Sequence, residues 1–259
     1  MTFPIEGRSS VMRSQELELS VVIPAFNEAS RLSETLGAAL DWLELDGRSF
    51  EVIVVDDGSS DGTGAVADAF ASRGVRTIRL PCNSGKGAAV RCGIHASRGH
   101  RVLMSDADFS TPIEELEKLE SRIGEAAVVI GSRAVADARI LRHQPFYREI
   151  LGKIFNRMLR LVGVRGLADT QCGFKLLDGA VARELFEQLV TPGFAFDVEL
   201  VWLARRAGYR VVEVGIVWDN SADSRVNMLV DPARMIFEIL RFRWHHRRHP
   251  RHDRPSSPS

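Results

Sequence analysis

The sequence predicts an α/β fold in which a doubly wound, mixed but mainly parallel sheet is flanked by helices. Short apolar runs rich in β-branched residues alternate with helical patterns four times in the first half of the chain. The runs are almost continuously apolar, as expected of parallel strands that helices cover on both faces. Acidic residues follow two of these runs directly. This alternation predicts right-handed crossovers between the strands.

The first half is expected to contribute four strands and four helices. Pro24 stops the first strand, and the helix after it opens near Asn27. The second strand runs into a turn rich in Asp, Gly and Ser, and the fourth ends in two carboxylates. The expected strands are residues 19–24, 50–55, 75–80 and a run from residue 101, and the expected helices are residues 30–45, 63–73, 87–97 and one starting near Pro112.

The second half is expected to complete the sheet. Residues 126–130 and 209–214 are predicted strands, the latter being the last one, and residues 134–144 a mobile loop beside the ligand. Helices are predicted over residues 179–189 and from Phe196, with Asp197 interpreted as a helix cap. The expected organisation is disorder over residues 1–18, one domain over residues 19–226, an amphipathic helix over residues 227–246 and a disordered basic tail over residues 247–259.

Composition excludes several classes of protein. With 259 residues, 45% hydrophobic and 26% charged, the chain reads as a soluble globular protein with a substantial core. Three cysteines without a C-x-x-C pair argue against a disulfide framework or zinc, and for a reducing compartment. No apolar run approaches a membrane span, and the N-terminus lacks a signal-peptide pattern. The formal net charge is zero, although residues 241–254 hold six Arg and four His against one Asp.

Two acidic pairs follow predicted strands. Asp106 and Asp108 end the fourth strand, and Asp56 and Asp57 end the second. Open α/β sheets place ligands at the carboxyl ends of strands, and hard oxygen ligands there suit Mg²⁺ or Mn²⁺ together with nucleotide phosphates. The alternatives are a cap on the helix near Pro112 for the first pair and turn chemistry for the second. The two pairs together favour the functional interpretation.

Two common nucleotide motifs are absent. No G-x-G-x-x-G follows the first strand, which argues against a dinucleotide dehydrogenase. Residues 85–87 resemble a phosphate loop but lack both its upstream Gly and its Ser or Thr. Lys86 could therefore meet a phosphate at the start of a helix, or be a solvated charge.

Five motifs resemble family 2 glycosyltransferases of the GT-A fold. They are residues 22–28 (VIPAFNE), 54–63 (VVDDGSSDGT), 106–108 (DAD), 131–133 (GSR) and 169–175 (DTQCGFK). The last two resemble the polyprenyl-phosphate sugar synthases, most closely the dolichyl-phosphate β-glucosyltransferases and next the dolichyl-phosphate mannose synthases. Mannose synthases commonly carry Gln where this chain has Ser110, which leaves one fewer protein ligand for the metal.

The resemblance implies site residues. A divalent cation, Mg²⁺ or Mn²⁺, would be held by Asp106 and Asp108. The catalytic group would be Asp106, Asp108, Asp169, Gln171 and Lys175. The nucleotide sugar would contact Pro24, Ala25, Phe26, Glu28, Asp56, Asp57, Asp106 and Arg133, and we add Lys86. The acceptor phosphate would meet Arg133, Lys175 and Arg225.

Two amphipathic helices fit a membrane-bound acceptor. Residues 145–163 combine an apolar face with a mostly basic one, as a helix lying on an anionic bilayer requires, and the alternative is a surface helix packed on its own core. Asp231 and Pro232 start a second helix, through about His245, whose apolar residues cover more than half its circumference. The basic tail after it could contact acidic lipids, with a solvated tail as the alternative. Nucleic acid is not an expected partner, because no aromatic residues are interleaved with the basic ones.

These observations lead to one functional hypothesis. The protein would be an inverting enzyme that moves glucose from UDP-glucose to a polyprenyl phosphate at the cytoplasmic membrane face. A phosphate acceptor is already anionic at neutral pH, so it needs cations more than a base. The rivals are a GDP-mannose-dependent synthase, a soluble transferase with a hydroxyl acceptor and Asp169 as base, and a silent nucleotide-sugar binding module.

Overall fold

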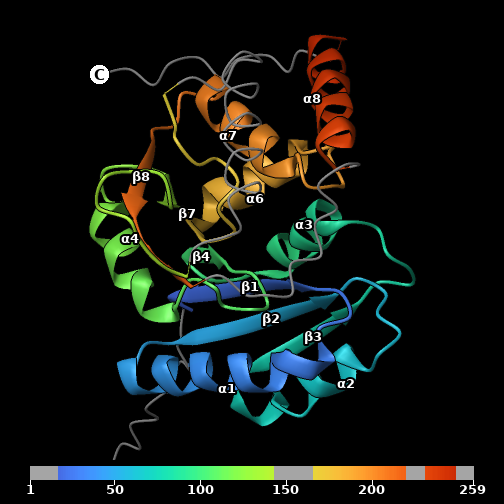
Figure 1. Ribbon diagram of the computed structural model, residues 1–259, viewed down its shortest axis with the longest axis vertical. Helices are drawn as coiled ribbons and strands as arrows, with labels where there is room; N and C mark the ends of the chain where they lie inside the picture. Colours follow the sequence, from blue (N-terminus) through green and yellow to red (C-terminus); the bar gives the residue numbers. More distant parts are fainter. Residues whose placement is uncertain (1–16, 143–165, 220–230, 249–259) are drawn as a thin grey trace, which may run out of the picture.

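A computed structural model describes residues 17–142, 166–219 and 231–248, and within them a seven-stranded sheet dominates (Figure 1). The strands lie in the order β3-β2-β1-β4-β7-β5-β8, and β6 and β9 form a separate parallel pair. The strands are β1 Leu19–Ala25, β2 Phe50–Asp56, β3 Val75–Arg79, β4 Arg101–Met104, β5 Val128–Ser132, β6 Arg139–Arg142, β7 Lys175–Asp178, β8 Val211–Gly215 and β9 Val217–Asp219.

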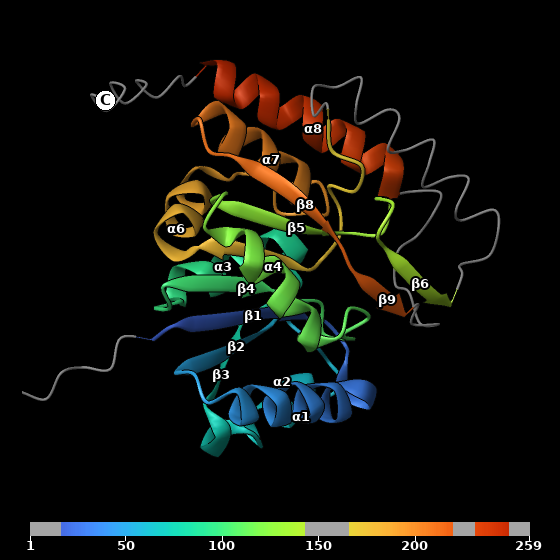
Figure 2. The same ribbon diagram turned by 90° about the vertical axis from the view of Figure 1, so that its left-hand side faces the viewer.

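Helices cover both faces of this sheet (Figures 1 and 2). α1, α2 and α4 lie on one face and α3, α6 and α7 on the other, with α8 packed outside α7. The helices are α1 Ala29–Asp46, α2 Thr63–Asp68, η1 Ala71–Arg73, α3 Lys86–Ala96, η2 Ile113–Glu115, α4 Leu116–Ile123, α6 Gly179–Gln188, α7 Phe196–Arg206 and α8 Asp231–Arg248. The sheet is mixed because β7 pairs antiparallel with β4 and β5, while the other pairs are parallel.

Sequence patterns account for the main elements. β1 is buried along almost its whole length, as a central strand covered on both faces should be. α1 buries Leu32, Leu36, Leu40 and Leu43, whose spacings of three and four residues place them on one face. The helix ends at Gly47, whose φ of 76° is the left-handed conformation that glycine adopts readily. The predicted mixed α/β class is therefore confirmed.

Several predicted boundaries need correction. Residues 63–73 form α2 and a separate 3₁₀ turn rather than one helix, and the segment predicted as a mobile loop contains β6. β8 is followed by β9, so residues 209–214 are not the last strand. β7 was not predicted, because only two apolar residues in its four carry a strand signal. The predicted helix at 145–163, Arg225, residues 1–16 and residues 249–259 lie outside the described residues. Residues 247 and 248 belong to α8 rather than to the predicted disordered tail.

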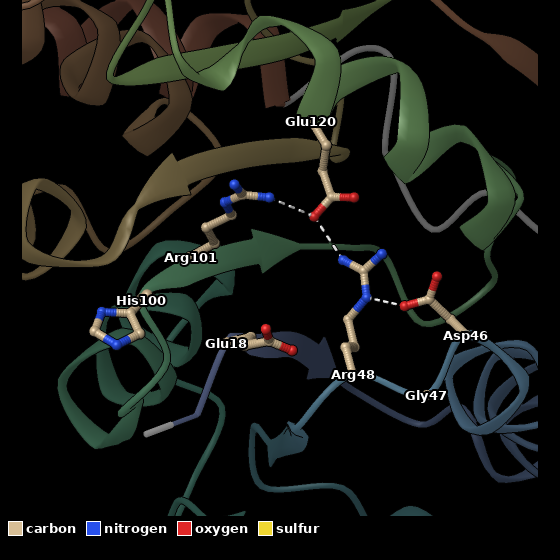
Figure 3. Close-up of a pocket in the computed structure, with 7 residues that line it drawn as sticks. All are labelled: Glu18, Asp46, Gly47, Arg48, His100, Arg101 and Glu120. Atoms are coloured by element: carbon tan, nitrogen blue, oxygen red, sulfur yellow. Dashed lines mark hydrogen bonds and ion pairs between the residues drawn. The ribbon is translucent and has the colours of Figure 1, made fainter. Parts of the chain in front are cut away.

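A cavity of about 520 Å³ lies at the opposite edge of the sheet from the acidic pairs (Figure 3). It opens where β1 and β4 begin, and its charged walls pair with one another. Glu120 of α4 contacts Arg48 at 2.5 Å and Arg101 at 2.9 Å, and Arg48 also pairs with Asp46. This mutual neutralisation favours a structural role for the cluster.

Candidate active site

The predicted acidic pairs meet at one edge of the sheet. β2, β1 and β4 are neighbours in the sheet order and run parallel. Ala25 at the end of β1 lies opposite Asp56 at the end of β2, and Asp106 follows β4 by two residues. The three strands start in register, with Leu19 opposite both Phe50 and Arg101, and this register brings the polar ends to the same level. The arrangement is the strand-end edge at which open α/β sheets bind ligands.

Asp106 lies at the centre of a charge cluster. Its Oδ1 is 2.6 Å from the Nζ of Lys86, which begins α3. Burial raises the pKa of the Asp106 carboxyl group, but Lys86, aided by Lys175 and Arg133, outweighs this and holds the pKa below its ordinary value. Lys86 is therefore a paired cation, and the interpretation as a merely solvated charge is wrong.

Gly173 explains how Asp106 is kept in place. A Cβ atom added at Gly173 would collide with both carboxylate oxygens of Asp106 and with its carboxyl carbon. Position 173 of the 169–175 motif must therefore be glycine, because the Asp106 carboxylate lies where any side chain would begin.

Replacing Gly173 with alanine is expected to lower kcat/KM by about 100-fold, because the Asp106 carboxylate must move by the order of 1 Å. The measurement is steady-state kinetics alongside Tm. Gly124→Ala is the matched control, since Gly124 has no neighbour within 4 Å of an added Cβ and its φ is −68°. Near-normal activity in Gly173→Ala would contradict the role of Gly173 in keeping Asp106 in place.

Asp108 is tied to the first strand through Arg31. Asp108 Oδ1 accepts a hydrogen bond from the backbone N–H of Ser110 at 3.0 Å, and its Oδ2 lies 3.6 Å from Arg31. Arg31 in turn forms a salt bridge with Glu28, which is buried directly after β1. No sequence signal singled out Arg31, because it lies within an ordinary amphipathic helix. It links the Glu28 and Asp108 positions that the resemblance had placed in one site.

The turns at this edge carry unusual backbone conformations. Among the described residues, the non-glycine residues with positive φ are Asn27 at 55° and Phe109 at 42°. Each lies just after a strand end, in the turns that follow β1 and β4. Such conformations concentrate at functional sites, where the surroundings hold them.

The second acidic pair holds the loop that leads to Lys86. Asp57 accepts hydrogen bonds from the N–H of Ser84 at 2.7 Å and of Gly85 at 2.9 Å, and Asp56 accepts from Ser59 at 2.9 Å. Burial raises the pKa of the Asp57 carboxyl group, the two N–H groups lower it in part, and the neighbouring Asp56 raises it further. Pro24 and Phe26 are partly exposed beside them, while Ala25 is buried in β1.

Arg133 and Asp169 form a bidentate pair. The Nε of Arg133 contacts Oδ2 of Asp169 at 2.6 Å and its Nη2 contacts Oδ1 at 2.9 Å, while its backbone N–H also donates to Oδ2. Trp218 lies 5.3 Å from the guanidinium as a cation–π partner. Burial raises the pKa of Asp169, but Arg133 outweighs this and holds the pKa below its ordinary range. A carboxylate held in this way is a weak general base.

Glu213 of β8 fixes the position of that pair. Its two carboxylate oxygens accept hydrogen bonds from the N–H groups of Ala168 and Asp169, both at 2.7 Å. Glu213 was not predicted as a site residue, because a single acidic residue within a strand carries no motif.

Lys175 and Asp197 form a buried ion pair. The Nζ of Lys175 contacts the carboxylate of Asp197 and the carbonyl oxygen of Cys172, and the Lys175 side chain has 0% exposure. Interpreting Asp197 as a cap was wrong: Ala195 occupies the N-cap position and Asp197 lies in the first turn of α7. Burial raises the pKa of Asp197, partly offset by Lys175 and Lys86. The enclosed ammonium favours positioning of the 169–175 loop over direct contact with an acceptor.

Gln171 and Arg133 line a small cavity of about 40 Å³ beside Asp106, with Trp218 on its wall. The Gln171 amide also lies 3.6 Å from the sulfur of Met235 on α8. Cys172 lines the same cavity, and burial raises the pKa of its thiol to about 11, which leaves it unreactive at neutral pH. The volume suits water or a single ligand group rather than a whole sugar.

The donor set at this edge fits a divalent cation. Within residues 17–142, 166–219 and 231–248, no group of three or more Asp, Glu, His or Cys side chains is arranged so that it could hold a metal ion. Mg²⁺ is nevertheless commonly held by one or two carboxylates plus substrate phosphates, which Asp106 and Asp108 can supply. The Lys86 ammonium at Asp106 shows that this position accepts positive charge.

Sequence comparisons identify relatives that match most of the chain. Residues 20–186 match the model of the family described as Glycosyl transferase family 2. The dolichyl-phosphate beta-glucosyltransferase of Mus musculus is 37% identical over 237 residues, which cover 85% of this chain and 73% of the relative. The protein of the same name from Saccharomyces cerevisiae is 33% identical, with 87% and 74% covered.

Solved structures share the fold at lower identity. Glucosyl-3-phosphoglycerate synthase from Mycobacterium tuberculosis superposes with a TM-score of 0.66 at 22% identity, covering 87% of this chain and 80% of its own. Mannosyl-3-phosphoglycerate synthase from Rubrobacter xylanophilus gives a TM-score of 0.63 at 22% identity, covering 93% and 79%. These likenesses confirm the predicted GT-A fold, and the family match confirms the predicted resemblance. The chain is a hexosyltransferase that belongs to glycosyl transferase family 2.

Proposed function

We propose that the protein transfers glucose from UDP-glucose to a polyprenyl phosphate such as dolichyl phosphate. The observation that carries this proposal is the 33–38% identity to relatives named dolichyl-phosphate beta-glucosyltransferase over 85–87% of this chain. The M. tuberculosis fold relative has been solved with Mn²⁺ and UDP-glucose, which supports a divalent cation and this donor class.

The charges of the site fit a phosphate acceptor. A phosphate monoester has a second pKa of about 6 and is already largely a dianion at neutral pH, so it can attack without losing a proton. Asp169 is occupied by Arg133 and is a weak base, which disfavours a hydroxyl acceptor. We assign Arg133 to a substrate phosphate and expect Arg225 to join it.

The reaction is a single displacement. The acceptor phosphate oxygen forms a bond to the anomeric carbon while the bond from that carbon to the UDP oxygen breaks on the opposite face, which inverts the configuration. Negative charge grows on the leaving diphosphate, and Lys86 lies beside Asp106 to neutralise it. A cation on Asp106 and Asp108 would supply Lewis-acid stabilisation of the same charge. Gln171 lines the small cavity beside Asp106, and we propose that it orients the sugar or the acceptor.

Helix α8 provides the membrane contact in this proposal. Phe237, Leu240 and Trp244 are 65%, 59% and 56% exposed, and their spacing places them on one outer face. Arg248 stacks on Trp244 at 4.0 Å, and further arginines lie along the helix. No helix within residues 17–142, 166–219 and 231–248 is long and apolar enough to cross a membrane. From the exposed apolar side chains and the arginines of α8, we propose peripheral binding to an anionic surface, at the cytoplasmic face.

A donor and acceptor panel tests the reaction. With Mn²⁺ or Mg²⁺ and a short polyprenyl phosphate, we expect glucose transfer from UDP-glucose to exceed mannose transfer from GDP-mannose by about tenfold or more. Robust mannose transfer without glucose transfer would show that the donor is GDP-mannose rather than UDP-glucose. Transfer to a small hydroxyl acceptor with none to the lipid phosphate would replace the acceptor class.

Vesicle sedimentation tests the membrane contact. Replacing Phe237 and Trp244 with serine is expected to lower binding to phosphatidylserine-containing vesicles by about tenfold or more, because each apolar side chain buried is worth about 1.5 to 3 kcal/mol. Leu45→Ser is the matched control, because Leu45 is 88% exposed on α1, at the far end of the molecule from α8 (Figure 1). Equal binding of both variants would contradict this role of α8.

A further inference from the structure

Helix α8 has an inner face that reaches the loop carrying Lys86. Its outer face holds the three exposed apolar residues, while Glu238 and His246 on the inner face are buried at 6% and 8% exposure. Both inner side chains act on residues 190–195, the segment that joins α6 to α7. Figure 1 shows this connection lying between α8 and α3.

Glu238 holds the second half of that segment. Its Oε2 accepts a hydrogen bond from the N–H of Ala195 at 3.2 Å. A Cβ atom at Gly193 would collide with the same carboxylate, so the backbone is pressed against Glu238. Arg234, one turn earlier on α8, lies 3.5 Å from its other oxygen.

His246 holds the first half through Glu199 of α7. Glu199 is fully buried and accepts hydrogen bonds from the N–H groups of Val190, at 3.1 and 3.2 Å, and Thr191, at 2.8 Å. The Nε2 of His246 lies 2.7 Å from the same carboxylate. The Trp202 ring packs against the His246 imidazole, with the ring centroids 5.2 Å apart and the planes tilted by 32°.

The segment in turn encloses the start of α3. The carbonyl oxygen of Pro192 accepts a hydrogen bond from Ala88 at 3.1 Å. A Cβ atom at Gly85 would lie 2.5 Å from the Pro192 oxygen, and one at Gly87 would lie 2.5 Å from the Thr191 oxygen. The two glycines flanking Lys86 are therefore needed for the segment to approach.

We propose that Glu238 and His246 are positioning residues for the donor phosphates: α8 holds residues 190–195 against α3 and so sets the place of Lys86 beside Asp106. This inference rests on the proposed role of Lys86 at the donor diphosphate. Because the outer face of the same helix is the proposed lipid contact, α8 joins the membrane surface to the nucleotide side of the site. The surface that the outer face of α8 would contact is an anionic lipid surface.

The test uses the full chain and three variants. Glu238→Gln removes the charge at Gly193, and His246→Phe keeps the stacking on Trp202 but removes the contact with Glu199. His246→Gln restores a donor at that position. Glu120→Gln is the control, because Glu120 is also a largely buried carboxylate with two arginine partners, at the opposite edge of the sheet (Figure 3).

We expect Glu238→Gln and His246→Phe to weaken UDP binding in Mn²⁺, and to raise the donor KM, by about 2- to 30-fold with kcat and the acceptor KM little changed. His246→Gln should recover most of the loss, and Glu120→Gln should lower Tm without changing UDP affinity. Wild-type UDP affinity in both test variants, whatever their Tm, would overturn the proposal.

The two proposals fail separately. UDP titration by calorimetry needs no acceptor, with GDP run alongside as the second probe, so it reports on α8 even if no lipid phosphate is glucosylated. If the wild-type protein binds nucleotide normally but transfers no sugar, the proposed acceptor is wrong, while the positioning role of Glu238 and His246 is unaffected.

Discussion

Replacing Asp106 with alanine is expected to lower kcat by about 10²- to 10³-fold, the range for losing one group that stabilises developing charge. The variant removes one of the two carboxylates available to a cation and leaves Lys86 without its 2.6 Å partner. The measurement is steady-state transfer at saturating donor and metal.

Asp41→Asn is the control for that variant. Asp41 also forms an ion pair, with Arg73, but it is exposed, and Arg73 precedes the start of β3, at the opposite end of the strands from Asp106. The control should keep full activity. Comparable activity in Asp106→Ala and wild type would show that the acid pair after β4 does not serve the donor.

Replacing Asp197 with alanine is expected to destabilise the protein by about 3 to 5 kcal/mol, because it leaves the Lys175 ammonium buried without its partner. Lys175 has 0% and Asp197 4% side-chain exposure, so water cannot take over the lost contact. Urea unfolding monitored by circular dichroism gives the free energy of unfolding.

The double variant Lys175→Met with Asp197→Leu separates the ion pair from the rest of the site. Removing both charges should recover most of the lost stability, since apolar replacements of buried pairs are often neutral. We expect its activity to stay low if the pair positions the 169–175 loop. A single-variant loss below about 1 kcal/mol would contradict the buried-pair description.

The fold and the acidic pairs could be predicted because their signals are local. Buried parallel strands appear in a sequence as continuous apolar runs, and a carboxylate directly after such a run lies at the end of the strand. Asp56 and Asp106 were placed correctly at one edge for this reason. The family resemblance was carried by motifs in the same turns.

The remaining contacts could not be predicted because they join distant segments. Lys175 meets Asp197 across 22 positions, and Asp169 meets both Arg133 and Glu213 over longer separations. An acidic residue in the first turn of a helix usually caps the helix or interacts with its dipole, so Asp197 was predicted to be a cap. Only the antiparallel insertion of β7 between β4 and β5 brings Lys175 to α7.

The central physical claim is that the acids after β2 and β4 organise one site in which a cation bridges a nucleotide diphosphate. The most direct test is calorimetric titration of UDP into the wild-type protein with Mn²⁺ and again after chelation. We expect the affinity to fall by about 100-fold without the metal, since such bridging is worth several kcal/mol. An unchanged affinity after chelation would contradict the claim.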